Sequence, residues 1–201
     1  MSLLLEGDMN ITLMDNLKNF AYAFTHLHTH TKNRHKAPHK AILLLSIIDL
    51  IETKVICSPQ IELTDELVRK FNINWKRYIG NSTLFKCNIE TPYYHMQYEP
   101  FWNLAEKIDI KSSLAAEGTQ WYKGTSFKKE LPKGGYSLKA LRSAFEYAKI
   151  DEKLFELLQN ADARALLRVL LISTYFTKQP TRTMPDFSKL VLTLSIIIFA
   201  A

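Results

Sequence analysis

The sequence predicts a single α+β domain that is mostly helical, with a buried leucine-rich central helix and a small β-sheet around residues 60–104. Residues 38–52 are apolar nearly all round, which is typical of a helix that is covered on every side. Residues 84–104 are rich in aromatic side chains, contain two prolines and lack helical periodicity, so they favour extended segments. With 201 residues, 47% of them hydrophobic, the chain is long enough for one domain with a substantial core.

The first half of the chain is expected to hold two helices and a loop. An amphipathic helix is predicted over residues 11–31, because its large apolar residues recur at spacings of three or four. We expect a loop over residues 33–37. Pro38 then occupies the first helical position of the central helix, which should end near Glu52.

The remaining elements are predicted from shorter signals. Ile61 and Leu63 alternate with polar residues, as in a strand, and Thr64 is a plausible N-cap for a helix that Gly80 ends. Residues 84–104 are interpreted as two short strands, one on each side of residues 98–100. Helices are expected over three further segments: 137–149, 151–159 and 161–176.

We divide the chain into three parts on composition. Residues 1–13 are an N-terminal extension, and residues 14–176 form the domain. Residues 177–201 are an atypical tail that ends in an uncharged apolar run. This run is compatible with a core strand, with a buried tail or with an out-of-frame extension of a truncated gene. A twelve-residue apolar run is too short to span a bilayer.

Positive charge is concentrated in two places. The formal net charge is +6, and residues 26–40 contain five histidines, four lysines or arginines and no acid. Residues 121–149 contain seven lysines or arginines against two acids. Cationic patches of this kind are typical of surfaces that meet nucleic acid. The first patch runs directly into the buried helix, so its position should be fixed.

The histidines leave two other function classes open. His26 and His30 are four residues apart, so on a helix they would share a face, as in a two-histidine zinc site. A metal-dependent hydrolase using the His26–His39 cluster is therefore one alternative, although we expect no bound metal because neighbouring cations oppose one and no acid occurs between residues 16 and 48. A protein-interaction scaffold with an incidental basic surface is the other. No cofactor is expected.

The cysteine content favours a reducing compartment. Cys57 and Cys87 are the only cysteines, too few for a disulfide framework. The N-terminus lacks the basic region of a signal peptide. We therefore expect a cytoplasmic protein that does not enter a membrane.

Three segments resemble the N-terminal recognition domain of HNH-type restriction endonucleases. They are APHKAILLLSIIDLIE (37–52), TPYYHMQYEPFWNL (91–104) and ELLQNADARALLRVLLISTYF (156–176), in the same order as in that family. The best understood relatives are sulfur-binding domains, which recognise phosphorothioate-modified DNA. The resemblance implies a DNA-binding module of a modification-dependent restriction system, with a defence role.

The resemblance also implies site residues. His39 and Lys40 match the basic pair at the start of the leucine-rich helix, and Pro92 with Tyr93 matches the apolar pocket motif. Two positions depart from the sulfur-reading pattern: Thr91 replaces an aromatic and Ala41 replaces a proline. The HNH nuclease motif is not visible after residue 176, so we expect this chain to bind double-stranded DNA, modified or not, without cutting it.

The sequence therefore yields a set of predicted DNA contacts. Lysine and arginine would contact phosphates, His39 would lie nearer the bases, and the proline and tyrosine would form an apolar contact. The predicted residues are Lys32, Arg34, Lys36, His39, Lys40, Pro92 and Tyr93. Lys128, Lys129 and Lys133 are candidates for further phosphate contacts. No catalytic residue is predicted, and the oligomeric state is left open.

Overall fold

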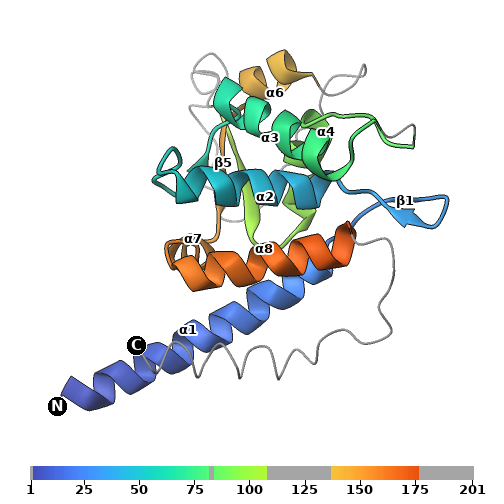
Figure 1. The fold of residues 1–201 in the computed structure, drawn as a ribbon. Coiled ribbons are helices and arrows are strands. Elements are labelled where there is room, and N and C mark those ends of the chain that lie inside the picture. The colour runs from blue at the N-terminus through green and yellow to red at the C-terminus, as the bar shows by residue number, and fades with distance from the viewer. Residues whose placement is uncertain (1, 82–83, 108–136, 177–201) are drawn as a thin grey trace, which may run out of the picture.

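The computed structural model describes residues 2–81, 84–107 and 137–176, with side chains from residue 14 onward. The predicted α+β class is confirmed: helices surround a small antiparallel sheet (Figure 1). The elements in chain order are α1 (Ser2–Thr25), β1 (Thr31–Lys32), β2 (His35–Lys36), α2 (His39–Glu52), β3 (Gln60–Ile61), α3 (Asp65–Tyr78), α4 (Glu90–His95), η1 (Met96–Tyr98), β4 (Trp102–Glu106), α6 (Leu138–Ala144), β5 (Phe145–Ile150), α7 (Glu152–Leu157) and α8 (Ala161–Tyr175).

Helix α2 is the centre of the domain, as the sequence predicts. It lies between α3 and α4 on one side and α8 on the other (Figure 1). Eleven of its fourteen residues are buried. Pro38 is the N-cap residue rather than the first helical residue, so the helix begins one position later, at His39. Complete enclosure explains why the apolar residues of α2 occupy all its faces.

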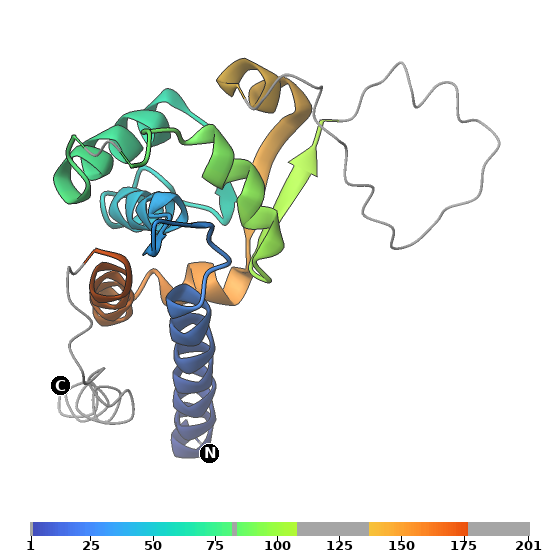
Figure 2. The ribbon, with the colours of Figure 1, turned by 90° about the vertical axis from the view of Figure 1, so that its right-hand side faces the viewer.

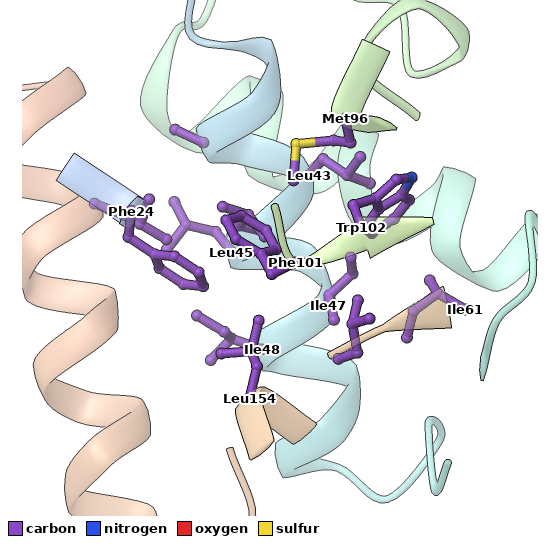
Figure 3. Packing of buried hydrophobic residues seen from close by; sticks show 14 of the residues in the cluster. Phe24, Leu43, Leu45, Ile47, Ile48, Ile61, Met96, Phe101, Trp102 and Leu154 are labelled. Atoms are coloured by element: carbon purple, nitrogen blue, oxygen red, sulfur yellow. The ribbon is translucent and has the colours of Figure 1, made fainter. Parts of the chain in front are cut away.

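Side chains from several elements pack around α2 to form the core. Figure 3 shows Leu43, Leu45, Ile47 and Ile48 of α2 among residues from other elements, including Phe24 of α1. The labelled partners from the rest of the chain are Ile61, Met96, Phe101, Trp102 and Leu154. One continuous core therefore joins segments that are far apart in sequence.

The predicted first helix is wrong at its C-terminal end. Helix α1 ends at Thr25, six residues earlier than expected, and extends through residues 2–13 at its other end. Figure 2 shows α1 projecting from the body of the domain, with the N-terminus at its far end. Thr25 donates its hydroxyl to the Ala21 carbonyl at 3.0 Å, and the residues that follow hold no run of apolar side chains to continue the buried stripe.

The predicted loop over residues 33–37 is instead the turn and second strand of a hairpin. Strands β1 and β2 pair antiparallel, with Lys32 opposite His35. Asn33 and Arg34 form the two-residue turn with φ of 50° and 63°. Two positive φ values match the turns that suit the twist of a hairpin, which usually carry Asn-Gly. Arginine at the second position hides that signal in the sequence.

The three-stranded sheet has the order β3-β5-β4, and its central strand was not predicted. Residues 145–149 were expected to belong to a helix over 137–149, but α6 ends at Ala144 and β5 follows. β5 pairs with β3 through Ile61 and with β4 from Trp102 onward. The partners on both sides come from distant segments, so local periodicity does not report this strand.

Residues 84–104 are half helical, which corrects the prediction of two strands. The second strand exists as β4, whereas residues 90–98 form α4 and η1. Pro92 lies in the first turn of α4, where a backbone N–H has no partner within the helix, so proline is tolerated there. Other predictions are confirmed: Thr64 caps α3 by accepting from the Leu67 N–H, and Gly80 follows that helix with φ of 63°.

Candidate functional site

The β1–β2 hairpin presents a cationic surface that the fold holds in place. All six residues from Thr31 to Lys36 are exposed, and three of them are Lys32, Arg34 and Lys36. The Ala37 N–H donates to the His30 carbonyl at 2.7 Å and closes the base of the hairpin. We call Thr31–Lys36 the basic hairpin.

Two of these cations also have contacts within the chain. The Lys32 ammonium lies 3.4 Å from the Leu84 carbonyl, and the Lys36 ammonium lies 5.6 Å from the centre of the Tyr175 ring. Both contacts are weak and at the surface, so the side chains can still be drawn to a ligand. Arg34 occupies the turn itself, the most protruding position of a hairpin.

A pocket of about 310 Å³ lies where the basic hairpin meets the helices. The hairpin contributes its flanking residues, α2 contributes its first turn, and α4 with η1 contributes the opposite wall. The lining residues are His28, Thr29, His30, Ala37, His39, Lys40, Thr91, Pro92, His95 and Tyr98. Three predicted site residues, His39, Lys40 and Pro92, therefore converge here although about fifty residues separate the two segments. We call this the histidine pocket.

Lys40 is buried and forms an ion pair that the sequence did not indicate. Its Nζ lies 2.5 Å from Oε1 of Glu99, and both side chains are almost fully enclosed. The same carboxylate accepts the His28 N–H at 3.0 Å and lies 3.2 Å from His28 Nδ1. Glu99 thus compensates the Lys40 charge and fixes the loop before the hairpin. Lys40 was predicted to contact a phosphate, but in the folded chain its ammonium is bound to the Glu99 carboxylate.

His39 packs on aromatic rings at one wall of the pocket. Its ring lies 4.7 Å from the Trp75 ring and 5.8 Å from the Phe85 ring, measured between centroids. Nε2 lies 2.9 Å from the Lys86 carbonyl, which fixes it as the N–H donor and leaves Nδ1 as an acceptor in the neutral ring. Burial lowers the pKa of His39 and the bond to Lys86 opposes that effect. The imidazole is therefore neutral at neutral pH.

His95 and Tyr98 form the opposite wall. Their rings stack with centroids 5.8 Å apart and an interplanar angle of 18°. Burial, with the nearby Lys40 charge, lowers the pKa of His95. Tyr98 is half exposed, so part of its ring faces the solvent beside the pocket.

The two residues of the predicted apolar motif separate in space. Pro92 is buried and lines the histidine pocket. Tyr93 points elsewhere: its hydroxyl donates to the Ile61 carbonyl at 2.7 Å and its ring meets Trp102 edge to face. Burial raises the pKa of Tyr93 well above its usual value. Successive residues of a helix face different directions, so only one of the pair reaches the pocket.

Sequence reasoning missed several residues of the site. His28 was assigned to the predicted helix over residues 11–31, and Tyr98 and Glu99 were placed at the break between two predicted strands. No local signal connects Glu99 to Lys40, because the pair forms only when η1 packs beside α2. Lys128, Lys129 and Lys133 lie outside the described residues.

The predicted two-histidine face does not form. Helix α1 ends before either residue, and His26 Nδ1 lies 2.9 Å from the Tyr22 carbonyl, with its ring stacked on that of Tyr22. Within residues 14–81, 84–107 and 137–176, no three His, Cys, Asp or Glu side chains are grouped so that they could hold a metal ion.

A second cavity, of about 340 Å³, has a different character. Its wall includes the acids Glu62, Asp65 and Glu146 together with the cations Lys107 and Arg142. Arg142 donates to the Leu63 carbonyl at 2.7 Å and to Asp65 at 2.6 Å. With three acids in its wall, this cavity suits a polyanion less well than the histidine pocket, which no acid lines.

Comparison with known proteins gives no family assignment: neither a scan against protein-family models nor a search of the curated proteins finds a match. Among the described helices, none combines the length and apolarity needed to cross a membrane.

Proposed function

We propose that this chain is a DNA-binding recognition module of a restriction-type HNH endonuclease that reads modified DNA. The observation that carries the proposal is the convergence of the predicted site residues. His39 and Pro92, from different segments, line one pocket, and this pocket adjoins the acid-free basic hairpin.

The basic hairpin would hold the phosphate backbone. Each lysine or arginine that neutralises a phosphate releases counterions, so binding should weaken steeply as salt rises. The hydrogen bond from the Ala37 N–H to the His30 carbonyl closes the base of the hairpin, and the chain enters α2 three residues after the hairpin ends. Both features hold the three cations on one element. Phosphate contacts of this kind position a protein on the duplex without reading sequence.

The histidine pocket would supply the selective contact. It lies at the foot of the hairpin, so a nucleotide whose phosphate meets the hairpin can place a neighbouring group in it. Pro92 and Ala37 give it apolar surface, and histidine and threonine side chains give it hydrogen-bonding groups. Such a mixture suits recognition of a small chemical feature of DNA.

A salt titration of duplex binding tests the proposal. The full chain should bind a short DNA duplex at low salt, and log Kd should rise linearly with log salt concentration. The triple variant Lys32→Gln, Arg34→Gln, Lys36→Gln should weaken binding and reduce the slope by up to about three, if each cation meets one phosphate. No measurable binding at low salt would overturn the proposal.

A matched control separates local contact from overall charge. The triple variant Lys18→Gln, Lys54→Gln, Lys153→Gln removes three exposed lysines, on α1, just after α2 and on α7. It lowers the net charge by the same amount as the hairpin variant. If both triple variants weaken binding equally, the hairpin is not the contact surface.

Competition between modified duplexes tests the recognition role. Plain, methylated and phosphorothioate duplexes of one sequence should compete unequally for the wild-type chain. Pro92→Ala should alter this order of preference, provided its unfolding curve shows that it is folded. Identical competition by all three duplexes would contradict modification-dependent binding.

A further inference from the structure

We infer that the histidine pocket accepts an extruded nucleobase, so that the module binds a duplex with one base rotated out of the stack. This inference rests on the proposed DNA binding and names the group that the pocket would take. Proteins that handle an extruded base hold it between flat or apolar side chains and hydrogen-bond its edge. The histidine pocket offers both kinds of contact.

The charge of the pocket favours a neutral ligand over a phosphate. The Lys40 ammonium, the one permanently charged group in the lining, is compensated by Glu99 at 2.5 Å. His39 and His95 have lowered pKa values and are neutral at neutral pH. The uncompensated cations lie outside, on the basic hairpin, where the backbone of the extruded nucleotide would pass.

The shape of the pocket favours a flat ligand. Two nearly parallel aromatic rings, those of His95 and Tyr98, line the pocket, and Pro92 and Ala37 add apolar surface. A base of any identity can stack on an aromatic side chain, because every base has a flat π face. A volume of about 310 Å³ is at the small end of ligand pockets, which suits one base rather than a larger molecule.

Hydrogen-bonding groups line the same space. His39 Nδ1 is an acceptor, because Nε2 donates to Lys86. Thr29 and Thr91 also line the pocket, and each hydroxyl can donate or accept. A base edge that carries both donors and acceptors would be matched by this set, whereas a phosphate carries acceptors only.

Three duplexes that differ at one position test the inference. One has a normal base pair, the second has a mismatch, and the third has abasic sites in place of both bases of that pair. Extrusion is least costly for a mismatched base, so the full chain should bind the mismatched duplex roughly tenfold or more tightly than the paired one. The abasic duplex should lack this gain, because it bends as easily but has no base to insert.

Two pairs of variants confine the effect to the pocket. Thr91→Trp fills the pocket from its exposed rim, and Ser143→Trp adds the same side chain at an exposed position on α6. The mismatch preference should disappear in the first and persist in the second. Tyr98→Ala should reduce the preference severalfold, whereas Tyr98→Phe, which keeps the ring, should retain it.

The outcomes separate this inference from the proposed function. Equal affinity for all three duplexes would overturn the base pocket and leave DNA binding intact. Equal preference for mismatched and abasic duplexes would also overturn it, since flexibility and not a base would be recognised. A phosphorothioate preference with no mismatch preference would show that the pocket reads the backbone instead. Failure to bind any duplex would overturn both proposals.

Discussion

Lys40 and Glu99 form a buried ion pair across the start of α2, with 2.5 Å between Nζ and Oε1. Because each charge is removed from water, the pair is held by mutual compensation, and either partner alone would be strongly unfavourable. The same carboxylate holds the backbone of His28. This one contact therefore fixes the floor of the histidine pocket and the loop that leads to the basic hairpin.

Removing one partner of this pair should destabilise the fold. Lys40→Met leaves the Glu99 carboxylate buried without a counter-charge, and we expect a loss of about 3–5 kcal/mol in the free energy of unfolding, measured with urea. The double variant Lys40→Met, Glu99→Gln should recover part of this loss, since the amide still accepts from His28. If Lys40→Met unfolds at the same urea concentration as wild type, the ion pair is not structurally important.

Arg34 should contribute one phosphate contact. It lies at the turn of the basic hairpin and is exposed. Arg34→Gln should lower the slope of log Kd against log salt by about one and weaken binding similarly for all sequences. Lys153→Gln, on α7, is the control. An unchanged slope in Arg34→Gln would remove this residue from the interface.

Tyr93 should matter for stability and not for DNA affinity. Tyr93→Phe removes a buried hydrogen bond to the Ile61 carbonyl, and should reduce the free energy of unfolding by about 1–2 kcal/mol. Tyr22→Phe, at a side chain that is 65% exposed, should change it by less than about 0.5 kcal/mol. Weaker DNA binding by folded Tyr93→Phe would show that the tyrosine acts at the interface, as the sequence motif suggested.

His39 should make the protein less stable in mild acid. Burial keeps its pKa in the folded state below the ordinary histidine value of 6.5, so the unfolded chain binds the proton more readily. Stability is then complete above about pH 6.5 and falls as the pH drops below it, until the folded pKa is reached. Urea unfolding between pH 7.5 and pH 5 should show this loss. The variant His39→Gln should lose less stability over this pH range. If its pH profile is identical to that of the wild type, His39 is not the group responsible for the loss.

Arg168 joins α8 to α2 through two carboxylates, and its removal should lower the stability of the fold. It donates to Asp49 at 2.6 Å and to Glu52 at 2.7 Å, and Asp49 also accepts from Asn74 of α3. Arg168→Met should cost about 1–3 kcal/mol, toward the lower value because the arginine is partly exposed. Arg69→Met breaks only an exposed pair with Glu66 and should cost less than about 0.5 kcal/mol. Comparable losses in the two variants would argue against a special role for the network.

Much of the framework is encoded in local patterns. The run of apolar residues behind Pro38 predicts α2 and its burial, because no exposed helix can be apolar on every face. Thr64 and Gly80 mark both ends of α3, since capping depends on residues within one turn of the helix end. The cations of residues 32–36 are visible in the sequence, and the structure adds only that they lie on a hairpin.

Other features exist only in the folded chain. Strand β5 was predicted as helix because its short apolar run is ambiguous, and its pairing with β3 and β4 depends on segments about forty or more residues away. Packing also decides that residues 90–98 are helical and that Tyr93 faces the core instead of the histidine pocket. No local rule places Glu99 beside Lys40.

The sequence by itself therefore determined the fold class, the central helix and the presence of a cationic segment, all of which depend on neighbouring residues. The tertiary structure alone decided which of those residues share a pocket and which of their charges remain uncompensated. The physical reason is range: helix periodicity and capping act over a few residues, whereas ion pairs, strand pairing and cavities join residues that meet only after the core has formed.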